Sequence, residues 1–289
     1  MRKGIALILT VTLAFCLSGC VSEKMQQAKK AYESADYSTA AQILSQEDLK
    51  DDADKEMLAV SNAHVSFDGG LYSDAIKHLL QLKEPQSNEL FDIATQTALS
   101  KALETESADQ LIDILELNCT ASVAIKDKLI SEANGLNNNS FKLIDAIVSS
   151  SLVSPEKDEL ATYITSNATK REQAFLIGTW EWQFDGDDVL TQIEVKPYQD
   201  SLIGIMKQAS STESEYCHVP GEVYWRDFVF IDANTFSCIN LSMSKTGVTS
   251  DTPGIGTIDY ADENSFHLQV TGVGGTNLLY GSRDWKRIS

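Results

Sequence analysis

The chain has 289 residues, enough for roughly two domains, and its 42 acidic residues outnumber its 23 basic residues, for a formal net charge of −19. This acid excess argues against nucleic acid as a partner, because a nucleic-acid-binding surface needs clustered lysine and arginine. It also disfavours adhesion of the folded body to anionic lipid, which attracts basic segments.

The first twenty residues have the layout of a secretory signal peptide. Arg2 and Lys3 form a short basic start, and an apolar stretch of fourteen residues runs from Gly4 to Leu17. A transmembrane helix needs about 20 apolar residues, so this stretch is too short for a comfortable span. A basic start, a short apolar middle and small residues at the end predict an exported protein instead.

The last four residues of this leader, Leu17-Ser18-Gly19-Cys20, resemble the lipobox of bacterial lipoproteins. The resemblance implies that the Cys20 thiol receives a diacylglyceryl group and that cleavage removes residues 1–19 as a signal peptide. Two acyl chains hold a protein stably at a membrane, whereas one holds it only marginally. We therefore expect a lipid-anchored protein on the extracytoplasmic side of a bacterial cell membrane. The alternative is an ordinary signal peptide that carries a cysteine near its end.

Composition divides the rest of the chain near residues 173–176. All four tryptophans follow residue 175, whereas residues 20–175 are rich in Ala, Leu, Ile, Lys and Glu at helical spacing. We expect α and β structure in separate domains: a helical-repeat domain over residues 20–174 and an antiparallel β-domain over residues 175–289.

The helical half contains an internal repeat of about thirty-five residues. Aligning the first copy on the second places Tyr37 on Tyr72 and Ala40 on Ala75. Self-similarity at this period predicts an α-solenoid of stacked helical hairpins, none of which buries its apolar face alone. The four copies are 31–44, 65–80, 106–115 and 138–147.

The first two copies resemble tetratricopeptide repeats, in which a small residue, an aromatic residue and an alanine mark the turn of each helix pair. The third copy departs from this pattern, because Gln110 stands at the alanine position. The resemblance implies a concave face suited to a protein or peptide partner. An irregular helical array is the alternative fold, and a role as a mere spacer is the alternative use of the array. The matching residues are Ala35-Asp36-Tyr37 before Ala40 and Gly70-Leu71-Tyr72 before Ala75.

Two capping signals predict helix starts in this half. Ser107 followed by Gln110 has the spacing of a capping box. Ser154-Pro155-Glu156 combines an N-cap residue, a proline at the first turn and an acid near the positive end of the helix. We expect the last helix to run over about residues 155–173 and to cap the stack.

Alternation with period two replaces the helical period at residue 177. Asp185-Gly186, which follows the first alternating stretch, is typical of a tight hairpin turn. About eight short strands without a helical period between them predict an antiparallel β-barrel or sandwich. The expected strands are 178–184, 190–195, 201–207, 226–231, 235–243, 256–260, 265–270 and 278–288.

The β-half is similar to a lipocalin-type barrel in Gly178-Thr179-Trp180 on the first strand and Arg283 or Arg287 on the last. In that family the tryptophan packs beneath an arginine of the closing strand and plugs one end of the barrel. The resemblance implies an open end that admits one small apolar ligand. An eight-stranded barrel is also narrow enough to be filled by side chains, and a generic sandwich is the alternative fold. The residues expected to line a ligand site are Trp180, Trp182 and Phe184.

Cys217 and Cys238 both fall in the β-half, twenty-one residues apart. In an exported protein they could form a disulfide, and two unpaired buried thiols are the equal alternative. Cys119 would remain as a small buried residue in the helical half.

The sequence contains no set of residues that indicates a reaction. His64 and His78 fall in one expected hairpin and could approach each other, but two separate surface histidines fit the pattern better than a metal site. The run 185–188 lacks the spacing of a calcium-binding EF-hand loop and fits a solvated hairpin tip.

We therefore expect no enzyme and no cofactor. The first functional hypothesis is a membrane-anchored scaffold that binds a protein partner through its helical repeats. The alternative is capture of a small apolar ligand inside the β-domain.

Overall fold

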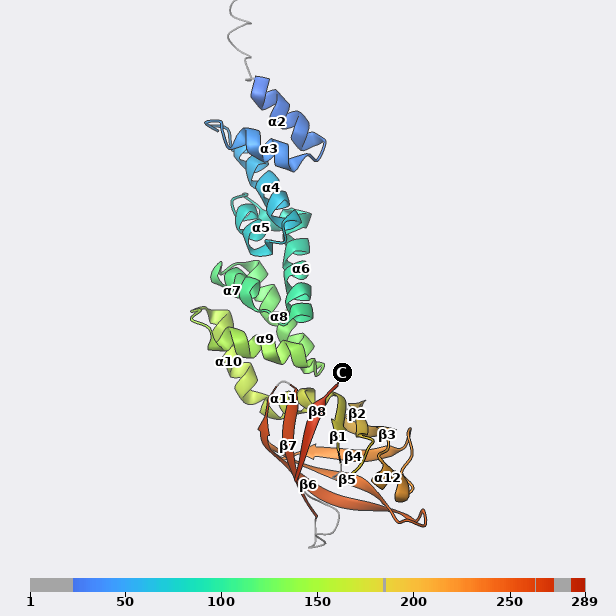
Figure 1. Ribbon diagram of the computed structural model, residues 1–289. Helices are drawn as coiled ribbons and strands as arrows, with labels where there is room; N and C mark the ends of the chain where they lie inside the picture. The colour runs from blue at the N-terminus through green and yellow to red at the C-terminus, as the bar shows by residue number, and fades with distance from the viewer. Residues whose placement is uncertain (1–22, 184–185, 263, 273–281, 289) are drawn as a thin grey trace, which may run out of the picture. The chain divides into compact units, whose positions relative to one another are not determined.

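The computed structural model describes residues 23–183, 186–262, 264–272 and 282–288 (Figure 1). Helices occupy the chain up to Leu176, and strands follow from Gly178. The expected combination of a helical part and a separate β-part is confirmed.

The chain forms two compact units, each described by itself. The repeat unit comprises Met1–Asp127 with Ser149–Lys157, and the barrel unit comprises Lys128–Val148 with Asp158–Ser289. The change in composition near residues 173–176 thus marks the switch from helix to strand. The division between the compact units falls earlier, at three points of the chain that lie within the helices 120–134, 138–149 and 155–166.

The described part of the repeat unit contains three helical hairpins, in each of which the second helix has eight residues. The second helices of the first two hairpins begin thirty-five residues apart, as the repeat predicts. The pairs are α2 (Glu23–Glu33) with α3 (Tyr37–Leu44), α4 (Asp52–Asp68) with α5 (Tyr72–Leu79), and α6 (Glu89–Thr105) with α7 (Asp109–Glu116). A short 3₁₀ turn, η1 (Pro85–Ser87), precedes α6, and α8 (Thr120–Asn134) follows α7.

The same aromatic pair recurs in the first two hairpins. Tyr32 meets Tyr37 edge to face with ring centroids 5.6 Å apart, and thirty-five residues later Phe67 meets Tyr72 in the same way at 5.5 Å. Edge-to-face pairs add roughly 0.5–1.5 kcal/mol to the burial of the rings. Each pair joins the end of a first helix to the start of a second helix and so sets the corner of its hairpin.

The turn between the two helices of each hairpin uses a residue in the left-handed region. Gly70 has φ +75°, and Ala35 and Glu106 take the corresponding place with φ +60° and +56°. Just beyond the turn, Ala40 and Ala75 are fully buried, so the helices approach closely at both positions. The turn conformation therefore persists in the third hairpin, although its sequence pattern does not.

The capping box expected at Ser107 is wrong. Ser107 Oγ donates to Asp109 Oδ2 at 3.1 Å, and the Gln110 side chain reaches another hairpin instead. Gln110 Oε1 accepts from the backbone N–H of Tyr72 at 2.7 Å, and its Nε2 donates to the carbonyl of Gly70 at 2.8 Å. Because α5 has no side-chain cap of its own, Gln110 satisfies its N-terminal N–H group from the following hairpin.

Three further helices lead to the strands: α9 (Asn138–Ser149), α10 (Pro155–Ser166) and α11 (Ala168–Leu176). The N-cap expected before α10 is confirmed, because Ser154 Oγ accepts from the backbone N–H of Lys157 at 3.2 Å. The single helix expected over residues 155–173 is interrupted at Asn167, which has φ −124° and ψ 33°. Asn167 Nδ2 donates to the carbonyl of Tyr163 at 2.9 Å and so competes with the helical ladder.

The described strands form a closed antiparallel barrel in sequence order, with β8 pairing back on β1 (Figure 1). Every expected strand is present, and the fold is a barrel rather than a sandwich. β1 ends at Trp182 and β2 begins at Thr191, so no two-residue loop joins these strands, and Asp185 of the hairpin turn expected at Asp185-Gly186 lies outside the described residues. The strands are β1 (Gly178–Trp182), β2 (Thr191–Tyr198), β3 (Ser201–Gln208), β4 (Val223–Phe230), β5 (Thr235–Met243), β6 (Thr249–Ala261), β7 (Ser265–Gly272) and β8 (Ser282–Arg287), and a short helix, α12 (Ser211–Glu215), follows β3.

Large aromatic side chains pack together inside the barrel. The core includes Trp180, Trp225, Trp285 and Phe266. A Cβ on Gly256 would lie only 2.4 Å from a ring carbon of Phe236, so this glycine allows the ring to lie over the neighbouring strand, β6, on which Gly256 is its direct partner.

We predict that Gln110→Ala weakens the attachment of α5 to the next hairpin by roughly 1–2 kcal/mol, because the substitution removes a cap and leaves backbone groups unpaired. Hydrogen exchange of the Tyr72 and Ser73 amides measures this loss directly. Gln96→Ala, at an exposed position of α6, is the matched control and should leave both exchange rates unchanged. Equal protection in Gln110→Ala and the wild type would contradict the assignment.

Candidate functional site

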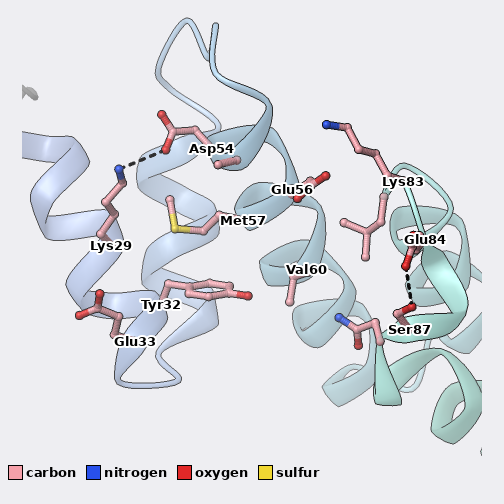
Figure 2. Close-up of a pocket in the computed structure, with 13 residues that line it drawn as sticks. Lys29, Tyr32, Glu33, Asp54, Glu56, Met57, Val60, Lys83, Glu84 and Ser87 are labelled. Atoms are coloured by element: carbon pink, nitrogen blue, oxygen red, sulfur yellow. Dashed lines mark hydrogen bonds and ion pairs between the residues drawn. The ribbon is translucent and has the colours of Figure 1, made fainter.

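An open groove with a volume of about 690 Å³ lies in the repeat unit (Figure 2). Its walls come from α2, from α4 and from residues 82–88, which connect α5 to α6. The walls are thus the first helices of two successive hairpins together with the connection that enters the third. A groove of this kind follows from the stacking of hairpins and does not depend on a special motif.

The apolar lining of the groove comes from Tyr32, Met57, Val60 and Leu82. Met57 is almost fully buried and also belongs to the small core between the first two hairpins, so the floor is rigidly supported. Tyr32 and Leu82 are only half-buried and keep apolar surface available to a ligand. In Figure 2 the Tyr32 ring extends from α2 toward α4.

The phenol of Tyr32 is a polar group within this apolar lining. Burial, and to a smaller extent the neighbouring Tyr37, raise the pKa of Tyr32, so its hydroxyl keeps its proton at neutral pH. Among the described residues this hydroxyl makes no hydrogen bond, and it can therefore donate to or accept from a bound chain.

Both lysines at the groove are paired with aspartates. Lys29 Nζ lies 3.5 Å from Asp54 Oδ1 and links α2 to α4, as the dashed line in Figure 2 marks. Lys83 Nζ lies 3.5 Å from Asp52 Oδ2. Asp54 is only 17% exposed, so the first pair is better shielded from solvent than the second.

Three glutamates complete the charged lining. Glu84 Oε2 accepts a hydrogen bond from Ser87 Oγ at 3.1 Å. Within the described residues the side chains of Glu33 and Glu56 form no ion pair or hydrogen bond. The groove therefore presents uncompensated negative charge above an apolar floor.

His64 and His78 do not form a metal site. The imidazole of His64 stacks on the Tyr37 ring, with centroids 3.7 Å apart and an interplanar angle of 3°. Burial lowers the pKa of His64, and the charge of Asp68 opposes this shift. Across the described residues no group of three or more His, Cys, Asp or Glu side chains is arranged to hold a metal ion.

In the barrel, Arg287 packs over Trp180 as the lipocalin resemblance implies. The guanidinium carbon lies 4.2 Å from the centre of the Trp180 ring. Arg287 Nη1 donates to the carbonyl of Ile177 at 2.7 Å, and Nη2 donates to that of Phe175 at 2.6 Å. The indole N–H of Trp180 donates to the carbonyl of Leu176 at 2.8 Å. Trp180 is completely buried.

Of the other two residues expected to line a ligand site, only Trp182 is described by the structure. The Trp182 ring is half-buried and lies beneath Arg283, whose guanidinium carbon is 4.2 Å from the ring centre. Phe184 lies outside the described residues.

Thr191 Oγ1 and Trp285 Nε1, both completely buried, have no hydrogen-bond partner among the described residues. Such buried orphan groups are uncommon and call for a physical explanation.

A buried polar cluster next to α12 was missed by sequence reasoning. The hydroxyl of Tyr224 donates to Glu213 Oε1 at 2.9 Å. His218 lies between two carboxylates, with Nε2 3.5 Å from Glu213 and Nδ1 2.5 Å from Glu222. Burial, followed by the charge of Glu213, raises the pKa of Tyr224. Because Glu213 lies on α12 and Tyr224 on β4, this cluster holds α12 against β4. No local pattern in the sequence indicates this cluster, because its members come from a helix, a strand and the connection between them.

Asp187 is not part of a solvated loop tip. Its side chain is almost fully buried and accepts hydrogen bonds from Thr212 Oγ1 at 2.9 Å and from the Thr212 N–H at 3.3 Å. Hydrogen bonds from Ser210 and Thr212 lower the pKa of Asp187. This carboxylate thus secures the start of α12.

The cysteines of the β-half are free. Cys217 is exposed in the connection between α12 and β4, and Cys238 is buried on β5. The disulfide considered between them is not formed, and the description as two buried thiols holds only for Cys238. Burial raises the pKa of Cys238 to about 12. Cys20, the expected site of lipid attachment, lies outside the described residues.

Comparison of the chain with protein-family models, with curated proteins and with solved structures found no match. In the part of the chain that the structure describes, no helix combines the length and apolarity that crossing a membrane requires.

We predict that Arg287→Ala lowers the free energy of unfolding of the barrel by roughly 2–4 kcal/mol, because it removes two charge-assisted hydrogen bonds and a cation–π contact. Arg287→Lys should restore only part of this loss, since an ammonium group lacks the planar fork. Urea unfolding followed by tryptophan fluorescence is the measurement, because all four tryptophans lie in the barrel unit.

Lys286→Ala, on the neighbouring exposed position of β8, is the control for Arg287 and should unfold like the wild type. Unchanged stability of Arg287→Ala would show that the stacking on Trp180 does not support the barrel.

Proposed function

We propose that this protein is a lipid-anchored protein of the bacterial cell envelope whose helical repeats bind a protein partner. The single observation that carries the proposal is the groove between α2, α4 and residues 82–88. Its volume of about 690 Å³ lies within the range of roughly 300–1,000 Å³ that is typical of binding sites. An apolar floor with polar and charged groups around it is also the anatomy of a protein interface.

The state of the surrounding residues supports the groove over the barrel interior. In the groove, Tyr32 and Leu82 are half-buried and can lose further surface to a partner. In the barrel, Trp180 and Trp285 are already fully buried, so a ligand would remove no further surface of these two side chains from water. Because new apolar burial drives most association, the groove is the better candidate.

The anchoring half of the proposal rests on the leader sequence. Arg2, Lys3, the apolar stretch and the lipobox-like Leu17-Ser18-Gly19-Cys20 together favour export and attachment through Cys20. Removal of residues 1–19 would delete two basic residues and no acid, and the net charge would fall from −19 to −21.

A second candidate function is capture of a small ligand inside the barrel. The completely buried Trp285 Nε1 and Thr191 Oγ1, which lack partners among the described residues, favour it. A ligand with a hydrogen-bond acceptor would satisfy the indole N–H, and so would a buried water molecule.

We predict that a photoreactive benzoylphenylalanine at Lys83, on the groove, forms a discrete crosslinked species on irradiation of intact cells. The same residue at Lys77, an exposed position of α5 outside the groove, is the matched control. Crosslinking at Lys83 and not at Lys77 supports the proposal. Identical products from both positions, or none from Lys83, would contradict it.

We also predict that Cys20→Ala abolishes incorporation of radiolabelled fatty acid, because the thiol is the expected attachment point. Cys119→Ala provides the control and should be labelled like the wild type. Equal labelling of the Cys20→Ala protein would reject the anchor.

A further inference from the structure

The charges around the groove are unevenly compensated. Lys29 and Lys83 are occupied by Asp54 and Asp52, each at 3.5 Å. In contrast, Glu33 and Glu56 have no ionic or hydrogen-bonding partner in the described part of the chain. The charge that the groove offers to a ligand is therefore negative, although lysines stand at its edge.

We propose that the occupant of the groove is an extended protein segment in which a lysine or arginine stands beside an apolar side chain. This inference rests on the proposed function and specifies the partner. The apolar side chain would cover Tyr32 and Met57, and the basic side chain would pair with Glu56. Glu33 lies on α2, in the preceding hairpin.

Glu56 is the better placed of the two acids. It belongs to α4, one residue before Met57, and its side chain is half-buried, whereas Glu33 is exposed. A partly buried charge is screened less by solvent than an exposed one, so an ion pair formed there is stronger. Figure 2 shows Glu56 between the walls of the groove, near Met57 and Val60.

Other occupants meet an electrostatic obstacle. An acidic segment would face Glu33 and Glu56, whereas the two lysines at the groove already pair with Asp54 and Asp52. A second copy of this chain would bring its own net charge of −19 against the same acids. An anionic lipid surface is repelled for the same reason.

The test compares two dye-labelled peptides of equal length in fluorescence anisotropy titrations of the whole soluble chain, residues 21–289. One peptide alternates leucine and lysine, the other leucine and glutamate, and the flanking glycines and serines are the same. We expect saturable binding of the lysine peptide and at least tenfold weaker binding of the glutamate peptide. Raising the salt concentration should weaken binding of the lysine peptide.

Variants locate the interaction. The Glu33→Gln/Glu56→Gln double variant should bind the lysine peptide roughly tenfold more weakly, with Glu56→Gln alone accounting for most of the loss. Glu116→Gln, on an exposed position of α7 outside the groove, carries the same change in charge as Glu56→Gln alone and should bind like the wild type. Far-ultraviolet circular dichroism confirms that each variant is folded.

Three results would overturn the inference: equal or tighter binding of the glutamate peptide, no binding of either peptide at millimolar concentration, or an unchanged affinity in the double variant. The proposed function fails separately, if a photoreactive residue at Lys83 captures nothing in cells. If capture succeeds and the crosslinked partner segment contains no lysine or arginine, the proposed function stands and only this inference falls.

Discussion

A helical hairpin of this size cannot bury its apolar face alone, and the structure of the repeat unit depends on each hairpin being covered by the next. Gln110 makes this dependence concrete, because its side chain from α7 hydrogen-bonds both the N–H of Tyr72 and the carbonyl of Gly70. The start of α5 is therefore completed only when the third hairpin is in place. The same stacking leaves the surfaces of α2 and α4 only partly covered, and the groove lies there.

The barrel unit is held together by different contacts. Arg287 stacks on Trp180 and donates to the carbonyls of Ile177 and Phe175, so one side chain joins the last strand to the segment that enters the first. A charged group is tolerated in this partly buried place because two of its N–H groups donate to backbone carbonyls. In the aromatic core, the Phe236 ring lies against Gly256 of the neighbouring strand. The two units thus differ: the strands of the barrel unit close on themselves, and the repeat unit presents an open groove.

Local sequence patterns predicted the fold. The features that sequence reasoning missed depend on contacts between residues far apart in the chain. Alternation of side chains predicted every strand, because period two is a property of the strand itself. The repeat aligned Tyr37 with Tyr72 correctly, since both set the same corner of a hairpin. Gln110 was assigned to its own helix, because nothing local indicates that its amide reaches back forty residues to Gly70. Asp187 was likewise placed in solvent, although it caps a helix twenty-five residues further along the chain.

The sequence predicted the type of candidate site but not the residues that form it. A concave helical face was expected as a partner surface, but the acids Glu33 and Glu56 do not stand out in a chain with 42 acidic residues. Their significance depends on Lys29 and Lys83 being neutralised by Asp54 and Asp52, which is a property of three-dimensional pairing. The cluster of Glu213, His218, Glu222 and Tyr224 shows the same limit, since it joins a helix and a strand with no shared motif.

The central claim is that the groove, and not the barrel interior, receives the partner. Methyl NMR of protein labelled at methionine tests it most directly, because Met57 lines the groove and Met206 lies in the barrel core. On titration with the partner segment recovered from cells, the account predicts that the Met57 methyl signal shifts and the Met206 signal stays in place. A shift confined to Met206 would contradict the account and assign binding to the barrel.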